Sequence, residues 1–206
     1  EGVATYSDPG TGILRYYSNG QKVWGYNHQL IGKGDSLLGD PDATQSVLIF
    51  PKPENPRFLF VFTLDANGGP DGMHYSLIDQ DMGTNGHIDK SFDNIPLASA
   101  VTEKQVIVQH CDKESYWHIA HAWGNNKFIC RNITTNGLSV APVETTTGPV
   151  YGGNADNAAG YMKATMDGDL LALAITGEDR VDIFQFDNLA GMPAFEFSIA
   201  NIPSPY

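Results

Sequence analysis

The sequence predicts an all-β fold, and three observations support this prediction. Apolar residues occur in short runs, such as residues 47–50 and 58–62, that are separated by turn residues. Charged residues make up only 17% of the chain while glycine (22) and proline (12) are frequent, which is typical of short strands joined by turns. No segment keeps the apolar period of an amphipathic helix for long enough to predict one.

The short runs recur in the same order along the chain. Each repeat has four runs rich in Val, Ile, Phe, Tyr and Trp, and successive repeats begin near Val3, Val47, Val106 and Met162. A repeat of four antiparallel strands is the blade of a β-propeller. We therefore predict a single β-propeller region of four-stranded antiparallel blades, about four of which are present, over approximately residues 1–45, 46–100, 101–150 and 151–206.

Inner and outer strands of the predicted blades differ in their patterns. Residues 47–50 and 170–173 are continuous apolar runs, as expected where both faces of a blade pack on neighbouring blades. Residues 194–199 alternate between apolar and polar, which suits an outer strand with one wet face.

Closure of the ring is the difficulty for this prediction. Propellers typically have four to eight blades, and a repeat unit cannot bury both of its faces alone. The chain supplies about four blades, and residues 202–206 stop where another blade would begin. We therefore expect a fragment of a longer chain with a larger propeller, or an arc whose open ends another molecule covers.

The charge of the chain excludes several kinds of partner. There are 24 acidic and 12 basic residues, which gives a net charge of −12, and Lys and Arg form no cluster. Nucleic acids and anionic membranes both require clustered cations, so neither is an expected partner. No apolar run reaches the length of a membrane-spanning helix, so we expect no membrane insertion.

One loop has the residue types of a calcium site. Asp65, Asn67 and Asp71 place oxygen ligands at alternate positions, and Ca²⁺ binds oxygen. Glycine stands at the fifth position of this loop, proline stands where the glycine of a calcium loop belongs, and no glutamate closes it. A plain hairpin turn therefore remains the alternative, and residues 79–85 are a second candidate of the same kind. Calcium is the only cofactor that the sequence suggests.

Aromatic side chains at turns are candidates for binding. Trp123 lies at a predicted hairpin tip beside Asn125 and Asn126, so we predict that these three residues contact a partner. Trp24 and Trp117 lie within predicted strands and are expected to pack in the core.

The histidines and cysteines are predicted to be structural. His118 and His121 are three residues apart on one strand, so they point to opposite faces and do not converge on a metal. Cys111 and Cys130 fall on the first and third strands of one blade, which are not neighbours. This placement disfavours a disulfide.

An ordered set of short strings resembles a known family. They include residues 14–20 (LRYYSNG), 37–40 (LLGD), 43–46 (ATQS), 69–76 (GPDGMHYS) and 116–121 (YWHIAH). Together they resemble the N-terminal β-propeller of gliding-motility-associated bacterial surface proteins exported by the type IX secretion system. The resemblance implies an extracellular or cell-surface location and a binding or scaffold role, with no catalytic residues. The string Asp35-Ser36-Leu37 resembles the O-glycosylation signal of such bacteria, which would make Ser36 the glycosylated residue.

Common enzyme motifs are absent from the sequence. There is no Gly-x-Ser-x-Gly, His-Glu-x-x-His or Gly-x-x-x-x-Gly-Lys string. We therefore predict an extracellular, non-catalytic binding or scaffold module for adhesion, appendage or matrix assembly, whose partner is a protein or a surface glycan. One alternative is a glycan-cleaving enzyme with paired carboxylates, for which Glu103, Asp112 and Glu114 are candidates near one rim, although solvated surface residues are the preferred interpretation of each. Another is a calcium-stabilised structural subunit that self-associates through its open blade edges.

Overall fold

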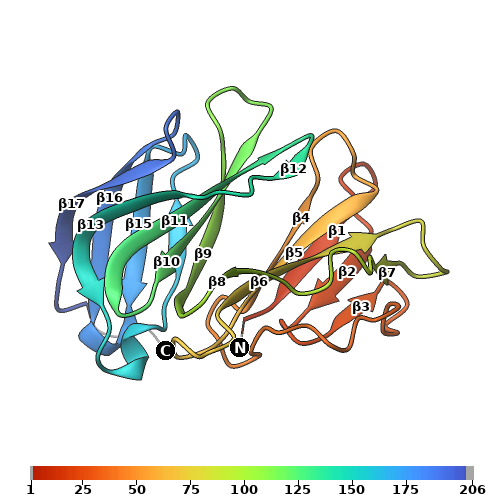
Figure 1. Ribbon diagram of the computed structural model, residues 1–206, viewed down its shortest axis with the longest axis horizontal. Coiled ribbons are helices and arrows are strands. Elements are labelled where there is room, and N and C mark those ends of the chain that lie inside the picture. Colours follow the sequence, from red (N-terminus) through yellow and green to blue (C-terminus); the bar gives the residue numbers. More distant parts are fainter. Residues whose placement is uncertain (1, 203–206) are drawn as a thin grey trace.

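The computed structural model describes residues 2–202 and confirms the all-β prediction, with four antiparallel sheets that follow one another along the chain (Figure 1). The first sheet has the order β1-β2-β3, and its strands are Ala4–Ser7, Leu14–Ser18 and Val23–Gly25. The second has the order β4-β5-β6-β7, with β8 also paired to β6. Its strands are Val47–Pro51, Phe58–Leu64, Met73–Asp79, His87–Ile88 and Ile95–Ala98.

The third sheet has the order β9-β10-β11-β12, with β13 also paired to β11. Its strands are Val101–Gln109, Tyr116–Ala122, Asn125–Thr134, Gly137–Leu138 and Val143–Tyr151. The fourth sheet has the order β14-β15-β16-β17, and its strands are Met162–Ala164, Leu170–Ile175, Arg180–Asp187 and Met192–Ile199. Two short 3₁₀ helices, η1 (Ala155–Asn157) and η2 (Thr176–Glu178), lie in connections.

Each inner sheet packs on one neighbour with one face and on the next neighbour with the other. Along β5, Leu59 and Val61 contact the first sheet, whereas Phe60 and Phe62 belong to the cluster that contains Ile133 of the third. Because successive strand residues point to opposite faces, a strand between two sheets must be apolar at nearly every position. This explains the continuous apolar run at residues 58–62.

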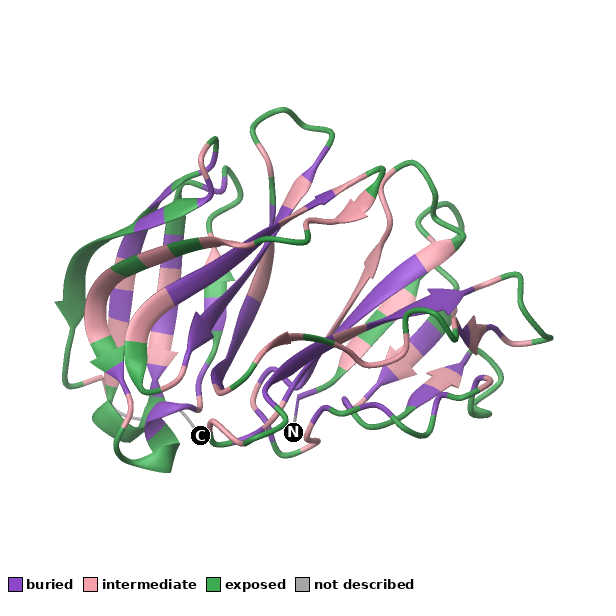
Figure 2. Cartoon of the chain, in the orientation of Figure 1, coloured by how far each residue is buried: buried purple, intermediate pink, exposed green. Residues whose placement is uncertain are grey.

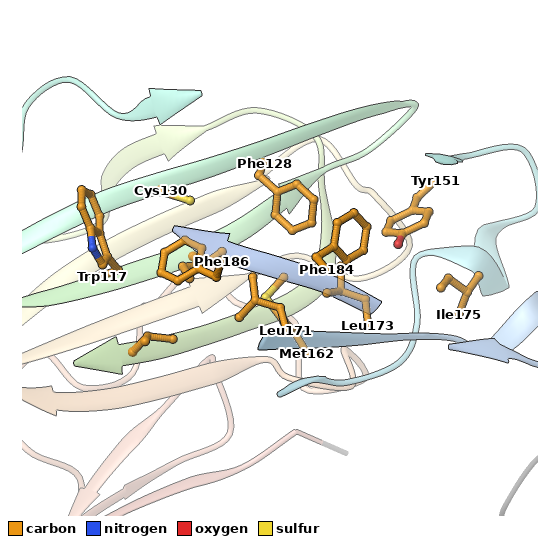
Figure 3. Close-up of a cluster of buried hydrophobic side chains, with 12 residues drawn as sticks. Trp117, Phe128, Cys130, Tyr151, Met162, Leu171, Leu173, Ile175, Phe184 and Phe186 are labelled. Atoms are coloured by element: carbon orange, nitrogen blue, oxygen red, sulfur yellow. The ribbon is translucent and has the colours of Figure 1, made fainter. Parts of the chain in front are cut away.

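The contact between the third and fourth sheets is the most extensive core cluster (Figure 3). Phe128 and Cys130 of β11 meet Phe184 of β16, with the Phe128 and Phe184 rings edge-to-face at 4.8 Å. Trp117 lies at one end of the cluster and donates its indole N–H to the Asn188 carbonyl at 2.8 Å. The prediction that Trp117 packs in the core is therefore confirmed.

Three strand predictions differ from the structure. The first sheet has three strands, and the run predicted as its fourth makes only an isolated bridge between Trp24 and Leu30. In the second and third sheets, two strands share the fourth position: β7 and β8 both pair with β6, and β12 and β13 both pair with β11. β15 alternates between buried and half-exposed residues and is not continuously buried, because no described element covers its second face.

Within residues 2–202, no helix has the length and apolar character needed to cross a membrane. The residues at the extremes of the predicted blades, residue 1 and residues 203–206, lie outside the described part of the chain.

The alternate packing of β5 leads to a test of the core. We expect Leu59→Ala to lower the free energy of unfolding by about 3 kcal/mol, because Leu59 is fully buried between two sheets and its removal leaves a cavity. Urea denaturation measures this change. Leu189→Ala, the same substitution at a 73% exposed turn residue, should change stability by no more than about 0.5 kcal/mol. Equal losses in the two variants would contradict the packing described here.

Candidate functional site

A cleft of about 560 Å³ lies between the first and second sheets. The loops that follow β1, β4 and β6 form its walls, so residues far apart in sequence meet there. Ten polar or aromatic residues line it: Tyr6, Asp8, Arg15, Tyr16, Tyr26, Arg57, Gln80, Asp81, Thr84 and Asn85. A concave site with a few convergent polar groups is the usual form of a small-molecule site.

The Asp8 carboxylate is hydrogen-bonded within its own loop. Its Oδ1 accepts hydrogen bonds from the Gly10 amide (3.1 Å), the Thr11 amide (2.9 Å) and the Thr11 hydroxyl (2.9 Å). The hydrogen bond from the Thr11 side chain is the main reason why the pKa of Asp8 lies below its usual range. Asp8 therefore stays ionised and has little capacity to accept a further proton.

Arg57, which lines the cleft, forms an ion pair with Asp79. The guanidinium donates from Nε and Nη2 to the two carboxylate oxygens at 2.7 and 2.6 Å, a bidentate arrangement. The hydrogen bond from Arg57 lowers the pKa of Asp79 and, in turn, raises that of Arg57. Asp79 Oδ1 also accepts the Asp81 amide at 3.0 Å, which fixes the backbone position of Asp81.

Asp81 and Arg15 keep hydrogen-bonding capacity free for a ligand. The Asp81 carboxylate is 69% exposed, and its side-chain contact among the described residues is Arg57 Nε at 3.4 Å. The Arg15 guanidinium is 46% exposed and contacts Asp8 at 3.4 Å. The cleft thus presents one carboxylate that can accept a proton and one cation that can stabilise a negative oxygen.

Three tyrosines complete the cleft. Burial raises the pKa values of Tyr6 and Tyr16, so both hydroxyls stay protonated at neutral pH and can donate a hydrogen bond. Tyr26 also lines the cleft and is 55% exposed. Aromatic faces and hydroxyl groups together suit a polyhydroxylated ring.

Two further polar residues, Gln45 and Glu103, hold the sheets together through hydrogen bonds. Gln45 Oε1 accepts the amides of Gln105 (3.2 Å) and Met162 (2.7 Å), which joins the second, third and fourth sheets. Glu103 accepts from the Thr44 amide and hydroxyl, both at 2.7 Å, and from the Asn67 amide at 2.9 Å. Because both carboxylate oxygens of Glu103 are occupied, we assign this residue a structural role.

The predicted carboxylate group is wrong. Glu103 lies near the beginning of β9, whereas Asp112 and Glu114 lie in the turn beyond its end. A strand of this length separates its two ends by roughly 25–30 Å, so the residues lie at opposite rims. Asp112 also caps its own turn, because it accepts hydrogen bonds from the Glu114 and Ser115 amides and the Ser115 hydroxyl.

The predicted binding residues lie together at the turn between β10 and β11. Trp123 is half-buried, and its ring lies over Gly68. The Asn125 amide group donates to the Trp123 carbonyl within the turn (3.2 Å), and the Asn126 amide group donates to the Gly148 carbonyl of β13 (2.9 Å). Their contact with a partner stays a prediction.

The predicted calcium loop is a turn in which the Asp65 side chain accepts hydrogen bonds from backbone amides. Asp65 accepts the Ala66 amide through Oδ1 (2.9 Å) and the Asp71 amide through Oδ2 (3.0 Å), while Asn67 has a positive φ of 57°. Residues 2–202 contain no group of three or more His, Cys, Asp or Glu that could hold a metal ion. Calcium binding by Asp65, Asn67 and Asp71 stays a prediction. Ser36 is exposed, as a glycosylation site requires.

The strand histidines and the cysteines have the surroundings of structural residues. His118 stacks on Phe62 of the second sheet at 4.0 Å, and His121 packs against Tyr151 at 4.3 Å. Burial lowers the pKa of each histidine to about 3, so both are neutral at physiological pH. Cys111 and Cys130 are both free, and burial raises the pKa of Cys130 to about 12.

Comparisons with known proteins concern the fold alone. No protein-family model and no curated protein matches the chain. The periplasmic gluconolactonase of Pseudomonas aeruginosa is similar in structure, with a TM-score of 0.52 and 12% identity over 98% of this chain and 54% of that one. A Bacteroides fragilis protein provisionally named 6-phosphogluconolactonase has a TM-score of 0.51 and 14% identity, over 96% of this chain and 63% of that one.

A third solved structure, a protein of unknown function from Desulfotomaculum acetoxidans, has a TM-score of 0.50 and 14% identity over 97% of this chain and 56% of that one. The chain therefore spans between 54% and 63% of the length of these three proteins. The likeness supports the β-propeller fold that the sequence predicts.

The prediction of a non-catalytic binding or scaffold module is contradicted by this finding, as is the prediction that the chain is not an enzyme. Two of the three proteins that share the fold carry the names of lactonases, which are hydrolytic enzymes. That prediction rested on the absence of enzyme motifs, which carries little weight in a propeller, because sites there are built from loops of different repeats that no contiguous string records.

Sequence reasoning also missed the cleft itself. Residues 79–85 entered only as a calcium candidate, and Arg15 and Arg57 were not singled out. No sequence signal singles out these two arginines, because each of the four predicted repeats contains one: Arg15, Arg57, Arg131 and Arg180.

Lys104 gives a pH-dependent test of the polar interior. Its ammonium is buried and donates to the carbonyls of Asn157 (3.3 Å), Ala158 (2.6 Å) and Ala159 (2.7 Å). Burial lowers its pKa to about 7. Above pH 7 the unfolded chain therefore binds more protons than the folded chain at this residue, so the free energy of unfolding rises with pH. In urea denaturation, the free energy of unfolding of the wild type minus that of Lys104→Met should be larger at pH 9 than at pH 7.

Lys22→Met is the matched control, because Lys22 is exposed. Its gap from the wild type should stay constant over the same pH range. A constant gap for Lys104→Met as well would contradict the lowered pKa.

Proposed function

We propose that this chain belongs to a propeller hydrolase that opens uncharged sugar lactones in the cleft between the first and second sheets. The observation that carries the proposal is the pairing, in one cleft, of a carboxylate and a guanidinium that are both available to a ligand, Asp81 and Arg15. The names of the lactonases that share the fold supply the reaction class.

The proposed reaction is hydrolysis of a cyclic ester. Asp81 accepts a proton from a water molecule whose oxygen attacks the carbonyl carbon, and Arg15 stabilises the negative charge that develops on the carbonyl oxygen. The bond between the carbonyl carbon and the ring oxygen then breaks. The ring oxygen takes up the proton from Asp81, and the product is a hydroxy acid that ionises in water. The tyrosines hold the hydroxyl groups of the sugar.

The charges around the cleft favour an uncharged substrate. Arg15 and Arg57 are opposed by Asp8, Asp79 and Asp81, so two positive charges face three negative ones. The whole chain carries −12. A phosphate group on the substrate would therefore be repelled both at the site and during approach.

Cleavage of a glycosidic bond by paired carboxylates is less well supported. Asp8 and Asp81 both line the cleft, but the hydrogen bonds of Asp8 occupy one of its oxygens and lower its pKa. A glycosidase of that type needs a protonated carboxyl group as its acid, and Asp8 is the opposite.

The remaining finer predictions belong to this proposal as well. The four sheets would be four blades of a larger ring, and an extracellular location would suit a lactonase that meets free sugars outside the cell. The similar Pseudomonas protein is named as periplasmic. The resemblance to gliding-motility surface proteins stays a prediction.

Asp81→Asn tests the proposed base. We expect the variant to hydrolyse glucono-δ-lactone about 100-fold more slowly or worse, because the amide cannot accept the proton. Base consumption at constant pH, corrected for spontaneous hydrolysis, measures the rate. The backbone N–H at position 81 can still donate to the Asp79 carboxylate in the variant. The circular dichroism spectrum should therefore match that of the wild type.

Asp71→Asn serves as the matched control, because Asp71 is an exposed carboxylate in a loop that does not line the cleft. It should keep the wild-type rate. The proposed function is wrong if the wild type does not accelerate the hydrolysis, or if Asp81→Asn is as active as Asp71→Asn.

The preference for an uncharged substrate has its own test. We expect kcat/KM for glucono-δ-lactone to exceed that for its 6-phosphorylated form, and the difference to shrink as salt is added, because ions screen the repulsion. The two substrates are compared in the same assay at low and high ionic strength. A preference for the phosphorylated substrate would show that the charge argument fails, even if the chain is a lactonase.

A further inference from the structure

Asp79 is a buried carboxylate next to the cleft that does not line it. It is the last residue of β6 and is 7% exposed, whereas the side chain of Asp81, two residues further on, lines the cleft and is 69% exposed. Figure 2 shows this change from buried to exposed where β6 ends. A buried carboxylate needs hydrogen bonds and an opposite charge to compensate its burial, so the partners of Asp79 indicate what it does.

The partners of Asp79 are Arg57 and Asp81, which both line the cleft. Arg57 donates from Nε to Oδ1 at 2.7 Å and from Nη2 to Oδ2 at 2.6 Å, and the Asp81 backbone amide donates to Oδ1 at 3.0 Å. The hydrogen bond from Arg57 is the main cause of the lowered pKa of Asp79. One ionised carboxylate therefore fixes both the cation and the backbone of the residue proposed as the base.

Arg57 lies within reach of two carboxylates. Its Nε is 2.7 Å from Asp79 Oδ1 and 3.4 Å from Asp81 Oδ2. The Arg57 side chain is 48% exposed, so packing alone does not determine where its guanidinium points. Nε and Nη2 form one edge of the guanidinium, which makes two parallel hydrogen bonds to one carboxylate at a time. Since Asp79 takes this edge, the oxygens of Asp81 keep their capacity to accept hydrogen bonds in the cleft.

We propose that Asp79 is a positioning residue, which holds the Arg57 guanidinium away from Asp81 and thereby leaves the Asp81 carboxylate free to act as a base. The catalytic part of this inference rests on the proposed function. A carboxylate whose two oxygens both accept from a guanidinium has less capacity to take up a proton or to bind a water molecule. Asp79 acts through its neighbours, because it does not itself line the cleft.

The Asp79→Asn variant separates the charge of Asp79 from the shape of the loops. Two hydrogen bonds join the loops after β4 and β6 without the Asp79 side chain: the Gln80 amide donates to the Arg57 carbonyl at 3.0 Å, and the Gln80 side chain donates to the Pro56 carbonyl. In the variant, the asparagine oxygen can still accept the Asp81 amide, but its NH2 group cannot accept from a guanidinium. Arg57 then loses its bidentate partner, and Asp81 is the other carboxylate that it contacts.

Nuclear magnetic resonance of the Arg57 Nε–H group tests this exchange of partners without any substrate. The nitrogen chemical shift follows the carboxylate to which the group is bonded, and Arg57→Gln identifies the signal by its loss. In Asp79→Asn the shift should change as Asp81 is protonated, and the change should be absent in Asp79→Asn/Asp81→Asn. A shift in Asp79→Asn that does not vary with pH, or that varies equally in the double variant, would overturn the proposal.

A second measurement does not depend on the folding of Asp79→Asn. In the wild type and in Asp81→Asn, the Arg57 signal should have the same pH dependence, because Asp79 is its partner in both. A pH dependence in the wild type that Asp81→Asn removes would show that Arg57 is already paired with Asp81, which contradicts the inferred role of Asp79.

Hydrolysis of glucono-δ-lactone tests the catalytic consequence. We expect kcat of Asp79→Asn to fall about 10-fold, because Arg57 then occupies the proposed base. The double variant Asp79→Asn/Arg57→Gln removes the guanidinium and should recover most of the loss in kcat. If Asp79 only stabilised the fold, the second substitution would give no recovery. That result, or a wild-type kcat in Asp79→Asn, would show that Asp79 does not position Arg57.

The pH profile of kcat gives a readout that a purely structural role would not move. A guanidinium beside Asp81 favours its ionised form, so the fall of kcat at acidic pH should begin about one pH unit lower in Asp79→Asn. In Asp79→Asn/Arg57→Gln it should return toward the wild-type position. The other titratable groups that line the cleft are the same in all variants: Tyr6, Asp8, Arg15, Tyr16 and Tyr26. An acid limb that stays in place in Asp79→Asn would contradict the proposal.

Asp93→Asn is the matched control. Asp93 pairs with Lys33 at 3.3 Å and does not line the cleft, so this variant loses an ion pair elsewhere and should keep the wild-type kcat and pH profile. Circular dichroism shows whether each variant is folded. A wild type that does not hydrolyse the lactone would remove the proposed function, whereas the Arg57 signal would still decide whether Asp79 holds Arg57 away from Asp81.

Discussion

Each sheet in this chain has two apolar faces, and the fold depends on covering both. The alternation of side chains along a strand gives an inner sheet two cores, one with each neighbour. β5 shows this directly, because Leu59 and Val61 belong to one core cluster and Phe60 and Phe62 to another. The same constraint explains why β15, which has a neighbour on one side only, alternates.

Polar side chains set how the sheets align once apolar contact has brought them together. Apolar packing is not directional, whereas a hydrogen bond to a backbone amide fixes a position to within a few tenths of an ångström. Gln45 accepts amides from two further sheets, and Glu103 holds the start of β4 and the turn after β5. These bonds fix the end of the second sheet opposite to the loops after β4 and β6, which form the cleft.

The sequence was informative where the structure repeats and uninformative where it does not. The period of apolar runs predicted the sheets, but the two runs predicted to be buried on both faces, residues 47–50 and 170–173, are only partly buried. The division of a fourth strand into β7 and β8 could not be foreseen, because it depends on where a loop leaves β6. The cleft joins Arg15 and Asp81, which come from different sheets, and only the packing of those sheets brings them together. Glu103 and Asp112 are closer in sequence, yet the direction of β9 keeps them apart.

The contact of Lys104 with the fourth sheet has a consequence for how this region can change. Its ammonium reaches three main-chain oxygens and no side chain, so the join depends on the path of residues 157–159 and is indifferent to the side chains there. Gly160 fixes that path, because its φ is 120° and a β-carbon would come within 2.2 Å of the Ala174 carbonyl oxygen. Substitutions at Ala158 or Ala159 that preserve the loop conformation should therefore accumulate more freely than any change at the lysine or the glycine.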